Sequence, residues 1–236
     1  MTLLEVEGLT RHFGGVAAVD GINIELSRGE VRALIGPNGA GKSTLVGLIC
    51  GHTRPDAGRI WLEGQDITRA PAHVRVRLGI AYTFQITAIY PRLSVFDNAA
   101  LAVQSRLGPR ADQLPAETCA ALDRLGLADR AGEIAGEMSY GHQRLLEVAM
   151  GLALRPTLLI LDEPTQGLAA GDIAQIARVV RETAQEGTVL LIEHNMDVVM
   201  DLADRITVMA SGRSLAEGTP AEVRADPAVQ SAYLGR

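Results

Sequence analysis

Short apolar runs bounded by glycine or polar residues recur along the chain. They are VRALIG, LLILDEP, TVLLIEH and RITVMASG, at residues 31–36, 158–164, 188–194 and 205–212. Runs of four or five apolar residues of this kind are typical of strands that are buried on both faces. Between two of them, GDIAQIARVVRETAQEG has helical periodicity: it places Ile173, Ile176, Ala177 and Val180 on one face and ends at Gly187. This alternation of strand and helix predicts an α/β core with a mostly parallel sheet.

The first 30 residues follow a different pattern. LLEVEGLTRHF and GINIELSRGE alternate apolar and polar positions, as half-exposed antiparallel strands do. GRIWLEGQDI, at residues 58–67, repeats that alternation. We therefore expect a small antiparallel layer flanking the core.

Strand patterns fade between about Ile86 and Ala153, where residues 95–107 and 116–127 have helical patterns. We interpret this stretch as a helical insertion in a single domain. The predicted division is a core formed by residues 1–86 and 154–236, with a helical subdomain at 87–153.

Composition narrows the class of protein. The 236 residues are 47% hydrophobic and only 3% aromatic, which suits a helix-and-sheet core. The net charge is −6 and no dense Lys/Arg stripe occurs, so nucleic acid is not an expected partner. Cys50 and Cys119 lie far apart, without metal-ligand spacing, and are interpreted as free thiols. No apolar run reaches 18 residues and the N-terminus does not resemble a signal peptide, so we expect a soluble cytosolic chain.

GPNGAGKS, from Gly36 to Ser43, matches the phosphate-loop pattern G-x-x-x-x-G-K-[ST] in every position. It follows an apolar strand and precedes a helical run, which is the context that the motif requires. Its glycines let successive N–H groups surround a phosphate, Lys42 adds a charge for the β- and γ-phosphates, and Ser43 offers a hydroxyl to Mg²⁺. The alternative is an ordinary glycine-rich turn. The predicted nucleotide-binding residues here are Gly36, Pro37, Asn38, Gly39, Ala40, Gly41, Lys42, Ser43 and Thr44.

LLILDEP has the form of the second half of such a site. Its apolar strand delivers Asp162 at its carboxyl end, where ligands of open α/β sheets bind, so we expect Asp162 to hold magnesium. Glu163 is placed to accept a proton from an attacking water. The alternative is a pair of acids that cap a loop.

Two further strand ends carry weaker candidates. His194 follows the next core strand and could donate to the γ-phosphate, although a lone histidine there is more often a loop residue. Gln85, in YTFQ, ends another predicted strand, and its amide oxygen could join the magnesium shell and the nucleotide site.

MSYGHQR, residues 138–144, places serine and glycine directly before an apolar helical pattern. The order of phosphate loop, Gln85, this segment, LLILDEP and a strand ending in histidine resembles that of an ATP-binding cassette ATPase, over essentially the whole chain. The resemblance implies a P-loop NTPase (RecA-like) core that binds ATP and Mg²⁺, with Lys42, Glu163 and His194 in catalysis. The alternative for residues 138–144, which we name the signature segment, is a simple helix cap.

In that family, two ATPase domains pair head to tail, so each ATP lies between one chain's phosphate loop and the other chain's signature segment. The resemblance therefore implies that the partner's γ-phosphate is contacted in trans by Ser139, Tyr140, Gly141 and His142. Phe13 falls where the family places an aromatic ring against adenine; the alternative is a core phenylalanine.

Three positions depart from the family pattern. Tyr140 replaces a glycine, His142 stands where glutamine is usual, and Ala169 stands where Asp or Asn often contacts the opposite site. Because the signature contact is mainly made by the backbone, we expect binding to survive the first two. Ala169 leaves open a heterodimer whose partner supplies the better residue.

Finer features, including LLIEHNMDVVMDLADRITVM and the tail EGTPAEVRADPAVQSAYLG, resemble the ATP-binding subunits of branched-chain amino acid importers and of related urea and amide importers. This implies permease subunits, an indirect role for a solute-binding protein, and a peripheral position on the cytoplasmic side of the membrane. The alternatives are the ATPase of lipopolysaccharide export, a cassette ATPase outside transport, and a P-loop small-molecule kinase.

Overall fold

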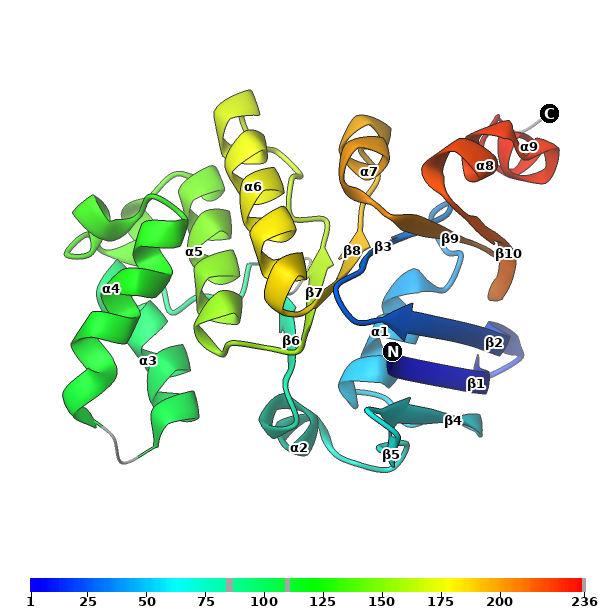
Figure 1. Ribbon diagram of the computed structural model, residues 1–236, viewed down its shortest axis with the longest axis horizontal. Coiled ribbons are helices and arrows are strands. Elements are labelled where there is room, and N and C mark those ends of the chain that lie inside the picture. The colour runs from blue at the N-terminus through cyan, green and yellow to red at the C-terminus, as the bar shows by residue number, and fades with distance from the viewer. Residues whose placement is uncertain (84–86, 109–110, 235–236) are drawn as a thin grey trace.

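The computed structural model describes residues 1–83, 87–108 and 111–234. Two sheets and a group of helices make up this part of the chain (Figure 1). The strands are β1 (Thr2–Phe13), β2 (Val16–Ser27), β3 (Val31–Ile35), β4 (Ala57–Leu62), β5 (Gln65–Asp66), β6 (Ile80–Thr83), β7 (Leu158–Asp162), β8 (Thr188–Ile192), β9 (Arg205–Ala210) and β10 (Arg213–Gly218). The α-helices are α1 (Lys42–Cys50), α2 (Ala72–Arg77), α3 (Val95–Leu107), α4 (Leu114–Arg124), α5 (Tyr140–Ala153), α6 (Ala170–Glu186), α7 (Met196–Leu202), α8 (Pro220–Ala225) and α9 (Pro227–Leu234).

The larger sheet has the order β10-β9-β3-β8-β7-β6, and its pairs are parallel except for β10 with β9. The four predicted apolar runs form β3, β7, β8 and β9, as expected. On β7, Leu158 and Ile160 join the apolar cluster that contains α1, whereas Leu159 and Leu161 join the cluster that contains α5 and α6. The strand is therefore covered on both faces, which explains its unbroken apolar run.

The smaller sheet is antiparallel, in the order β2-β1-β4-β5, and confirms the layer predicted from residues 1–30 and 58–67. Helix α1 lies between the two sheets: its Leu45 and Ile49 share one buried cluster with Leu4 of β1 and Ile160 of β7. The helix that follows the phosphate loop is thus fixed from both sides.

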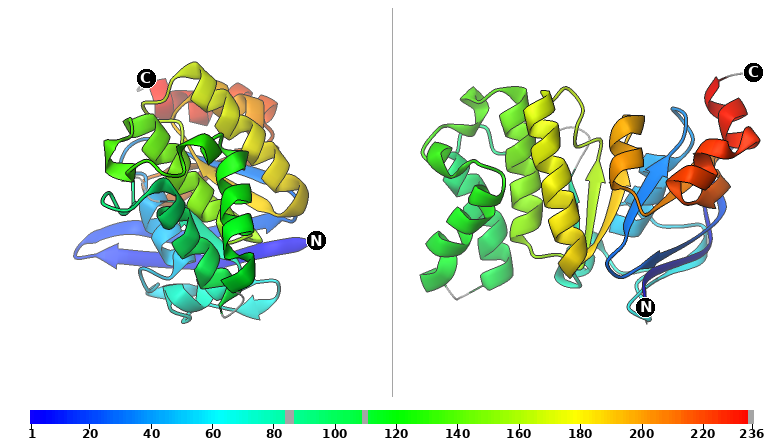
Figure 2. Two further views of the ribbon diagram at one scale, coloured as in Figure 1. Left: turned by 90° about the vertical axis from the view of Figure 1, so that its left-hand side faces the viewer. Right: turned by 45° about the horizontal axis from the view of Figure 1, so that its top comes forward.

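Helices α3, α4 and α5 are grouped at the far end of the larger sheet from the antiparallel layer (Figures 1 and 2). Helix α3 has the predicted bounds. The prediction of 116–127 for α4 is wrong at both ends. The helix begins at Leu114 because Pro115 fits its first turn, where no N–H is needed. It ends at Arg124, where tight turns bond Leu125 N to Leu122 O and Gly126 N to Asp123 O.

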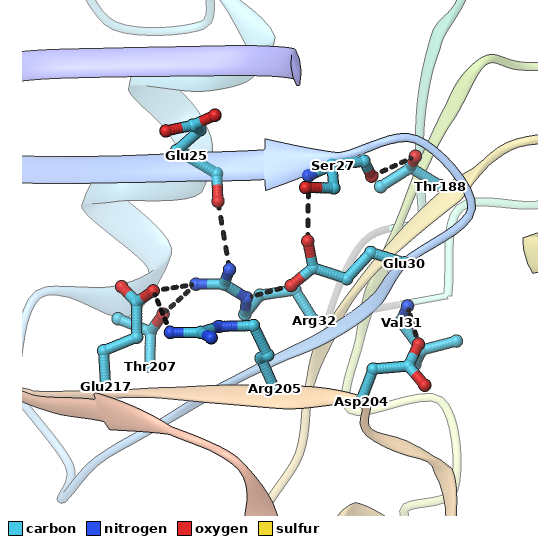
Figure 3. A network of polar contacts seen from close by, with 10 residues as sticks. All are labelled: Glu25, Ser27, Glu30, Val31, Arg32, Thr188, Asp204, Arg205, Thr207 and Glu217. Carbon is cyan, nitrogen blue, oxygen red and sulfur yellow. Dashed lines mark hydrogen bonds and ion pairs between the residues drawn. The ribbon is translucent and has the colours of Figure 1, made fainter. Parts of the chain in front are cut away.

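The buried guanidinium of Arg32 connects the two sheets at the amino end of β3 (Figure 3). The Arg32 side chain, 3% exposed, lies 2.5 Å from Glu30 Oε1 and 3.0 Å from Glu217 Oε1 of β10. It also donates to Thr207 Oγ1 of β9 at 2.9 Å and to the Glu25 carbonyl of β2 at 3.0 Å. One side chain therefore bonds to both sheets and to the C-terminal strand.

Replacing this arginine should strongly destabilise the fold. Arg32→Met leaves Glu30 buried without its guanidinium, and breaking a buried ion pair from one side costs about 3–5 kcal/mol. Urea denaturation followed by circular dichroism should show a loss of that size. Arg28→Met is the matched control, because the ion pair of Arg28 with Glu63 is exposed and its loss should change the free energy of unfolding by less than about 1 kcal/mol. Equal losses in the two variants would contradict the role given to Arg32.

Candidate functional site

The loop between β3 and α1 is held so tightly that two of its glycines admit no side chain. A Cβ on Gly36, whose φ is +153°, would lie 2.2 Å from the Met209 carbonyl oxygen. A Cβ on Gly41, whose φ is +102°, would lie 2.1 Å from the Ala18 carbonyl oxygen. Helix α1 begins directly afterwards, with no side-chain cap and no acidic residue in its first turn. Its first N–H groups and its dipole suit an anion.

The Lys42 side chain folds back over this loop. Its Nζ donates to Gly36 O at 2.7 Å and to Pro37 O at 3.1 Å. Burial lowers the pKa of Lys42, while the nearby carboxylates of Glu163 and Asp162 act in the opposite direction. The ammonium group is thus held beside the loop and faces two acids.

A cavity of about 490 Å³ opens over the loop. Its walls come from the start of β2, the phosphate loop and first turn of α1, and the loops that follow β7, β8 and β9. The lining residues are Val16, Ala17, Ala18, Asn38, Gly39, Ala40, Gly41, Lys42, Ser43, Thr44, Asp162, Glu163, Ile192, His194 and Ser211. A larger hollow of about 690 Å³ lies between α4, α5 and α6, away from these groups. We take the smaller cavity as the site because the predicted phosphate-binding and acidic residues meet there.

Asp162 ends β7 as predicted and is 3% exposed. The Tyr82 hydroxyl, from the neighbouring strand β6, donates to its Oδ2 at 2.9 Å. Burial raises the pKa of Asp162, and the Tyr82 hydrogen bond offsets part of that rise. The guanidinium of Arg144, on α5, donates to the Asp162 carbonyl oxygen.

Glu163 and His194 meet across the ends of β7 and β8. Glu163 adopts φ +50°, which is unusual for a residue with a side chain, and its N–H bonds to Ile192 O at 2.8 Å. His194 Nε2 lies 2.9 Å from Glu163 Oε1. The histidine is therefore no isolated loop residue, because it faces the acid that follows Asp162.

The signature segment does not line this cavity among the described residues. Ser139 caps α5: its Oγ accepts from His142 N at 3.3 Å and lies 2.9 Å from His142 Nδ1. The exposed Tyr140 ring packs near Gly167, since a Cβ on that glycine would lie 3.5 Å from Tyr140 Cε1. The start of α5 is thus less bare than its sequence suggests, because it has a serine cap.

Phe13 and Gln85 complete the set of predicted residues. Phe13 is 49% exposed, so its interpretation as a core residue is wrong. It pairs with Val16, which lines the cavity, and the Arg11 guanidinium lies 4.8 Å from its ring centroid. Gln85 lies outside the described residues, and its role stays a prediction.

Sequence reasoning missed Tyr82 and Arg144. Tyr82 stands in the quoted YTFQ, one strand position before Thr83, but only the pairing of β6 with β7 brings its hydroxyl to Asp162. Arg144 is buried and its NH1 donates to Glu147 Oε2 at 2.6 Å, while Glu147 Oε1 accepts from Ala88 N at 3.3 Å. An i, i+3 pair of opposite charge on a predicted helix was the available signal.

Comparisons with known proteins agree with this geometry. A family model described as ABC transporter matches residues 19–166, and one described as Branched-chain amino acid ATP-binding cassette transporter matches residues 213–236. The high-affinity branched-chain amino acid transport ATP-binding protein BraF of Pseudomonas aeruginosa is 37% identical, over 99% of this chain and 98% of BraF. LivG of Escherichia coli, a protein of the same description, is 36% identical over the same shares.

Ribose import ATP-binding protein RbsA 1 of Rubrobacter xylanophilus is 37% identical over 89% of this chain but only 43% of its own length. Among solved structures, a nucleotide-free ATP-binding cassette from an ABC transporter superposes with a TM-score of 0.89 at 31% identity, over 100% of both chains. An ATP-binding cassette solved in its ADP conformation gives 0.88, also at 31% identity and over 100% of both chains.

The raised pKa of Asp162 predicts a pH-dependent stability. Because the folded protein favours the protonated acid, Asp162 contributes stability at low pH that is lost as pH rises from its unfolded pKa, about 4, through its higher folded pKa. Asp162→Asn, which keeps an oxygen for Tyr82, should therefore unfold with a free energy roughly 1–3 kcal/mol higher than the parent near pH 7, and the gain should shrink towards pH 4. Urea denaturation in a pH series measures this.

The exposed acid Asp129 gives the control, and Asp129→Asn should change stability by less than about 0.5 kcal/mol at each pH. A gain for Asp162→Asn that is independent of pH would contradict the assignment to a buried ionised carboxylate.

Proposed function

The chain belongs to the ATP-binding proteins of ABC transporters, in the branched-chain amino acid transporter group, and we propose that its ATP hydrolysis drives uptake of a branched-chain amino acid or a related small amide or urea-type solute. ATPases of this family bind ATP. One observation carries the proposal. The start of α1, which no side chain caps, lines the same cavity as Lys42, Asp162 and the Glu163–His194 pair.

The solute class is supported by the C-terminal segment. Overall sequence identity does not indicate which solute is transported, since the BraF and ribose-import relatives are both 37% identical to this chain. Residues 213–236, however, match the family model named for branched-chain amino acids. They include β10, whose Glu217 bonds to the buried Arg32, so the first part of this segment is joined to the folded core.

The phosphates of ATP would lie over the start of α1. The first-turn N–H groups and Lys42 would face the β- and γ-phosphates, and the ammonium would exchange its bonds to Gly36 and Pro37 carbonyls for phosphate oxygens. Phe13, exposed at the rim next to Val16, would stack on adenine.

The oxygen ligands in the cavity fit magnesium. Ser43 and Asp162 both line it, and Mg²⁺ in nucleotide sites is held by one or two protein oxygens together with phosphates and water. No group of three or more His, Cys, Asp or Glu side chains in the described ranges could hold a metal alone, which agrees with an ion that arrives with the nucleotide. Gln85 remains a predicted third ligand. The ion would neutralise phosphate charge.

Glu163 would accept the proton of the attacking water, and His194 would donate to the γ-phosphate. Both roles are supported by their 2.9 Å contact at the cavity wall, because the acid and the imidazole are then brought to the same point. Lys42 would offset the negative charge that develops during transfer.

Removing the carboxylate should separate binding from hydrolysis. Glu163→Gln is expected to lower kcat by about 10²–10⁴-fold, the contribution typical of a general base, while the affinity for ATP stays within about twofold. Phosphate release and equilibrium titration with a fluorescent ATP analogue measure the two quantities. Glu5→Gln, an exposed acid on β1, is the control and should keep the parent rate. A parent-like rate in Glu163→Gln would rule out the base assignment.

The signature segment would contact the ATP of a second chain. It is supported by the position of Ser139 at an exposed helix start outside the chain's own cavity. There the Ser139 hydroxyl, the first N–H groups of α5 and the helix dipole would face the partner's γ-phosphate. Ala169 stands at the N-cap position of α6 and makes no side-chain hydrogen bond there, so its methyl group gives the opposite site no polar contact.

Light scattering of Glu163→Gln with and without Mg-ATP tests this pairing. We expect monomers without nucleotide and dimers with it. Adding Ser139→Asp keeps a good helix cap but sets a carboxylate against the phosphate, so the dimer should be lost; Ser139→Asn keeps the cap without the charge and should retain most of it. A dimer that survives Ser139→Asp would contradict contact in trans. A chain that stays monomeric with bound ATP would indicate a non-identical ATPase partner.

Membrane subunits would dock beside α5, the helix that begins within the signature segment. Tyr90, Leu93 and Ile134 are exposed large apolar residues, and Ala135 N bonds to Leu93 O at 2.9 Å, which holds the two segments together. No helix in the described ranges is long and apolar enough to cross a membrane. We therefore propose a peripheral subunit on the cytoplasmic side, with permease subunits as partners and a solute-binding protein as an indirect one.

We also keep the proposed division of the chain into a core, residues 1–86 and 154–236, and a helical subdomain, residues 87–153.

A further inference from the structure

A second contact joins the two loops that carry Glu163 and His194. The Glu193 carboxylate, in a residue 3% exposed, accepts hydrogen bonds on both oxygens. Thr165 donates to Oε1 from its backbone N–H at 2.9 Å and from its hydroxyl at 2.6 Å. The backbone N–H groups of His194 and Asn195 donate to Oε2 at 3.0 and 3.3 Å. One buried carboxylate thus binds four donors, two from each loop.

The partners of Glu193 are neighbours of the residues placed in catalysis. Thr165 lies two residues after Glu163, and His194 directly follows Glu193. The loops therefore meet twice, through Glu193 and Thr165 in the interior and through Glu163 and His194 at the cavity wall. Because the interior link fixes where both loops leave the sheet, it also fixes the separation of the two side chains at the wall.

A carboxylate is well suited to this position. Each of its oxygens can accept from more than one donor, whereas an amide has one accepting oxygen and an NH₂ group that can only donate. A buried carboxylate is tolerated only when it is well hydrogen-bonded, so its four bonds resist any separation of the loops.

We propose that Glu193 is a positioning residue for ATP hydrolysis, which holds the loops after β7 and β8 at the spacing that brings Glu163 and His194 together. This inference rests on the proposed function for its effect on rate. Its geometric part concerns only the contact between the two side chains, and can be tested without hydrolysis.

The first test is kinetic. Glu193→Gln turns one accepting oxygen into an NH₂ group that faces two hydrogen-bond donors, so the loops should move apart and kcat should fall by about tenfold or more. The KM for ATP should stay within about twofold of the parent value, because the phosphate loop is untouched. In a His194→Ala background the same substitution should cause less than about a twofold further loss, because one of the two side chains that Glu193 brings together is absent. The proposal would be overturned if Glu193→Gln lowered kcat by the same factor in His194→Ala as in the parent. A parent-like kcat in Glu193→Gln would also overturn it.

Thr165 supplies a second pair of variants in case Glu193→Gln does not fold. Thr165→Ser retains both donors and should keep the parent kcat, whereas Thr165→Val has nearly the same shape without the hydroxyl and should lower kcat severalfold at unchanged KM. Equal kcat values in these two variants would overturn the proposal.

The second test needs no hydrolysis. In the parent, Glu163→Gln should shift the NMR resonances of the His194 ring, one of five histidines, because the two side chains are in contact. In Glu193→Gln the same substitution should leave them nearly unchanged. A parent without ATPase activity would overturn the proposed function, and this measurement would still decide the positioning role: a shift that persists in Glu193→Gln excludes it.

Discussion

The two sheets must keep a fixed separation, because the candidate nucleotide cavity takes its walls from both. Val16 and Ala18 come from β2, whereas the phosphate loop, Asp162 and His194 follow strands of the larger sheet. The loop touches β2 so closely that Gly41 admits no Cβ. Apolar side chains of α1 fill the space between the sheets, and the Arg32 guanidinium bonds to both of them. Its planar set of donors reaches three directions at once, which an ammonium group could not do with the same geometry.

Arg32 lies near the amino ends of the parallel strands. At their carboxyl ends, Asp162 is held by elements that are distant in sequence. Tyr82 of β6 and Arg144 of α5 bond to the side chain and the backbone of Asp162, respectively. Helix α5, which begins within the signature segment, is therefore attached to the strand that ends in the candidate magnesium ligand. Glu147 extends this connection to Ala88, close to the exposed apolar residues proposed to face the membrane subunits. The complete set of these contacts forms only when all three elements are packed together.

The sequence predicted those features that depend on local chemistry or on the spacing of apolar residues along the chain. Buried parallel strands have unbroken apolar runs, and the phosphate loop needs eight consecutive residues, so both were visible, as was the placement of Asp162 at a strand end. The contacts of Tyr82 and Glu193 depend on which strands become neighbours, which a single chain does not reveal. The amino-terminal limit of α4 differs from the predicted one because Pro115 lies just before the predicted range, although proline fits a first helical turn. Phe13 lies where register shifts interrupt the pairing of β1 with β2. Its exposure could therefore not be deduced from the alternation of apolar and polar residues along β1.

The turn after Glu163 has contacts on both of its sides, and this bears on how two ATP sites could influence each other. Thr165 bonds to Glu193 beside His194, while Gly167 lies against the Tyr140 ring at the start of α5. In a head-to-tail pair, His194 would serve the chain's own ATP and the signature segment the partner's. A change at one ATP would then reach the other through this single turn, because the four hydrogen bonds of Glu193 cannot be given up without leaving a buried carboxylate unsatisfied. The path runs through the backbone of this turn, the buried Glu193 and the exposed Tyr140 ring, and so does not require a polar side chain at Ala169.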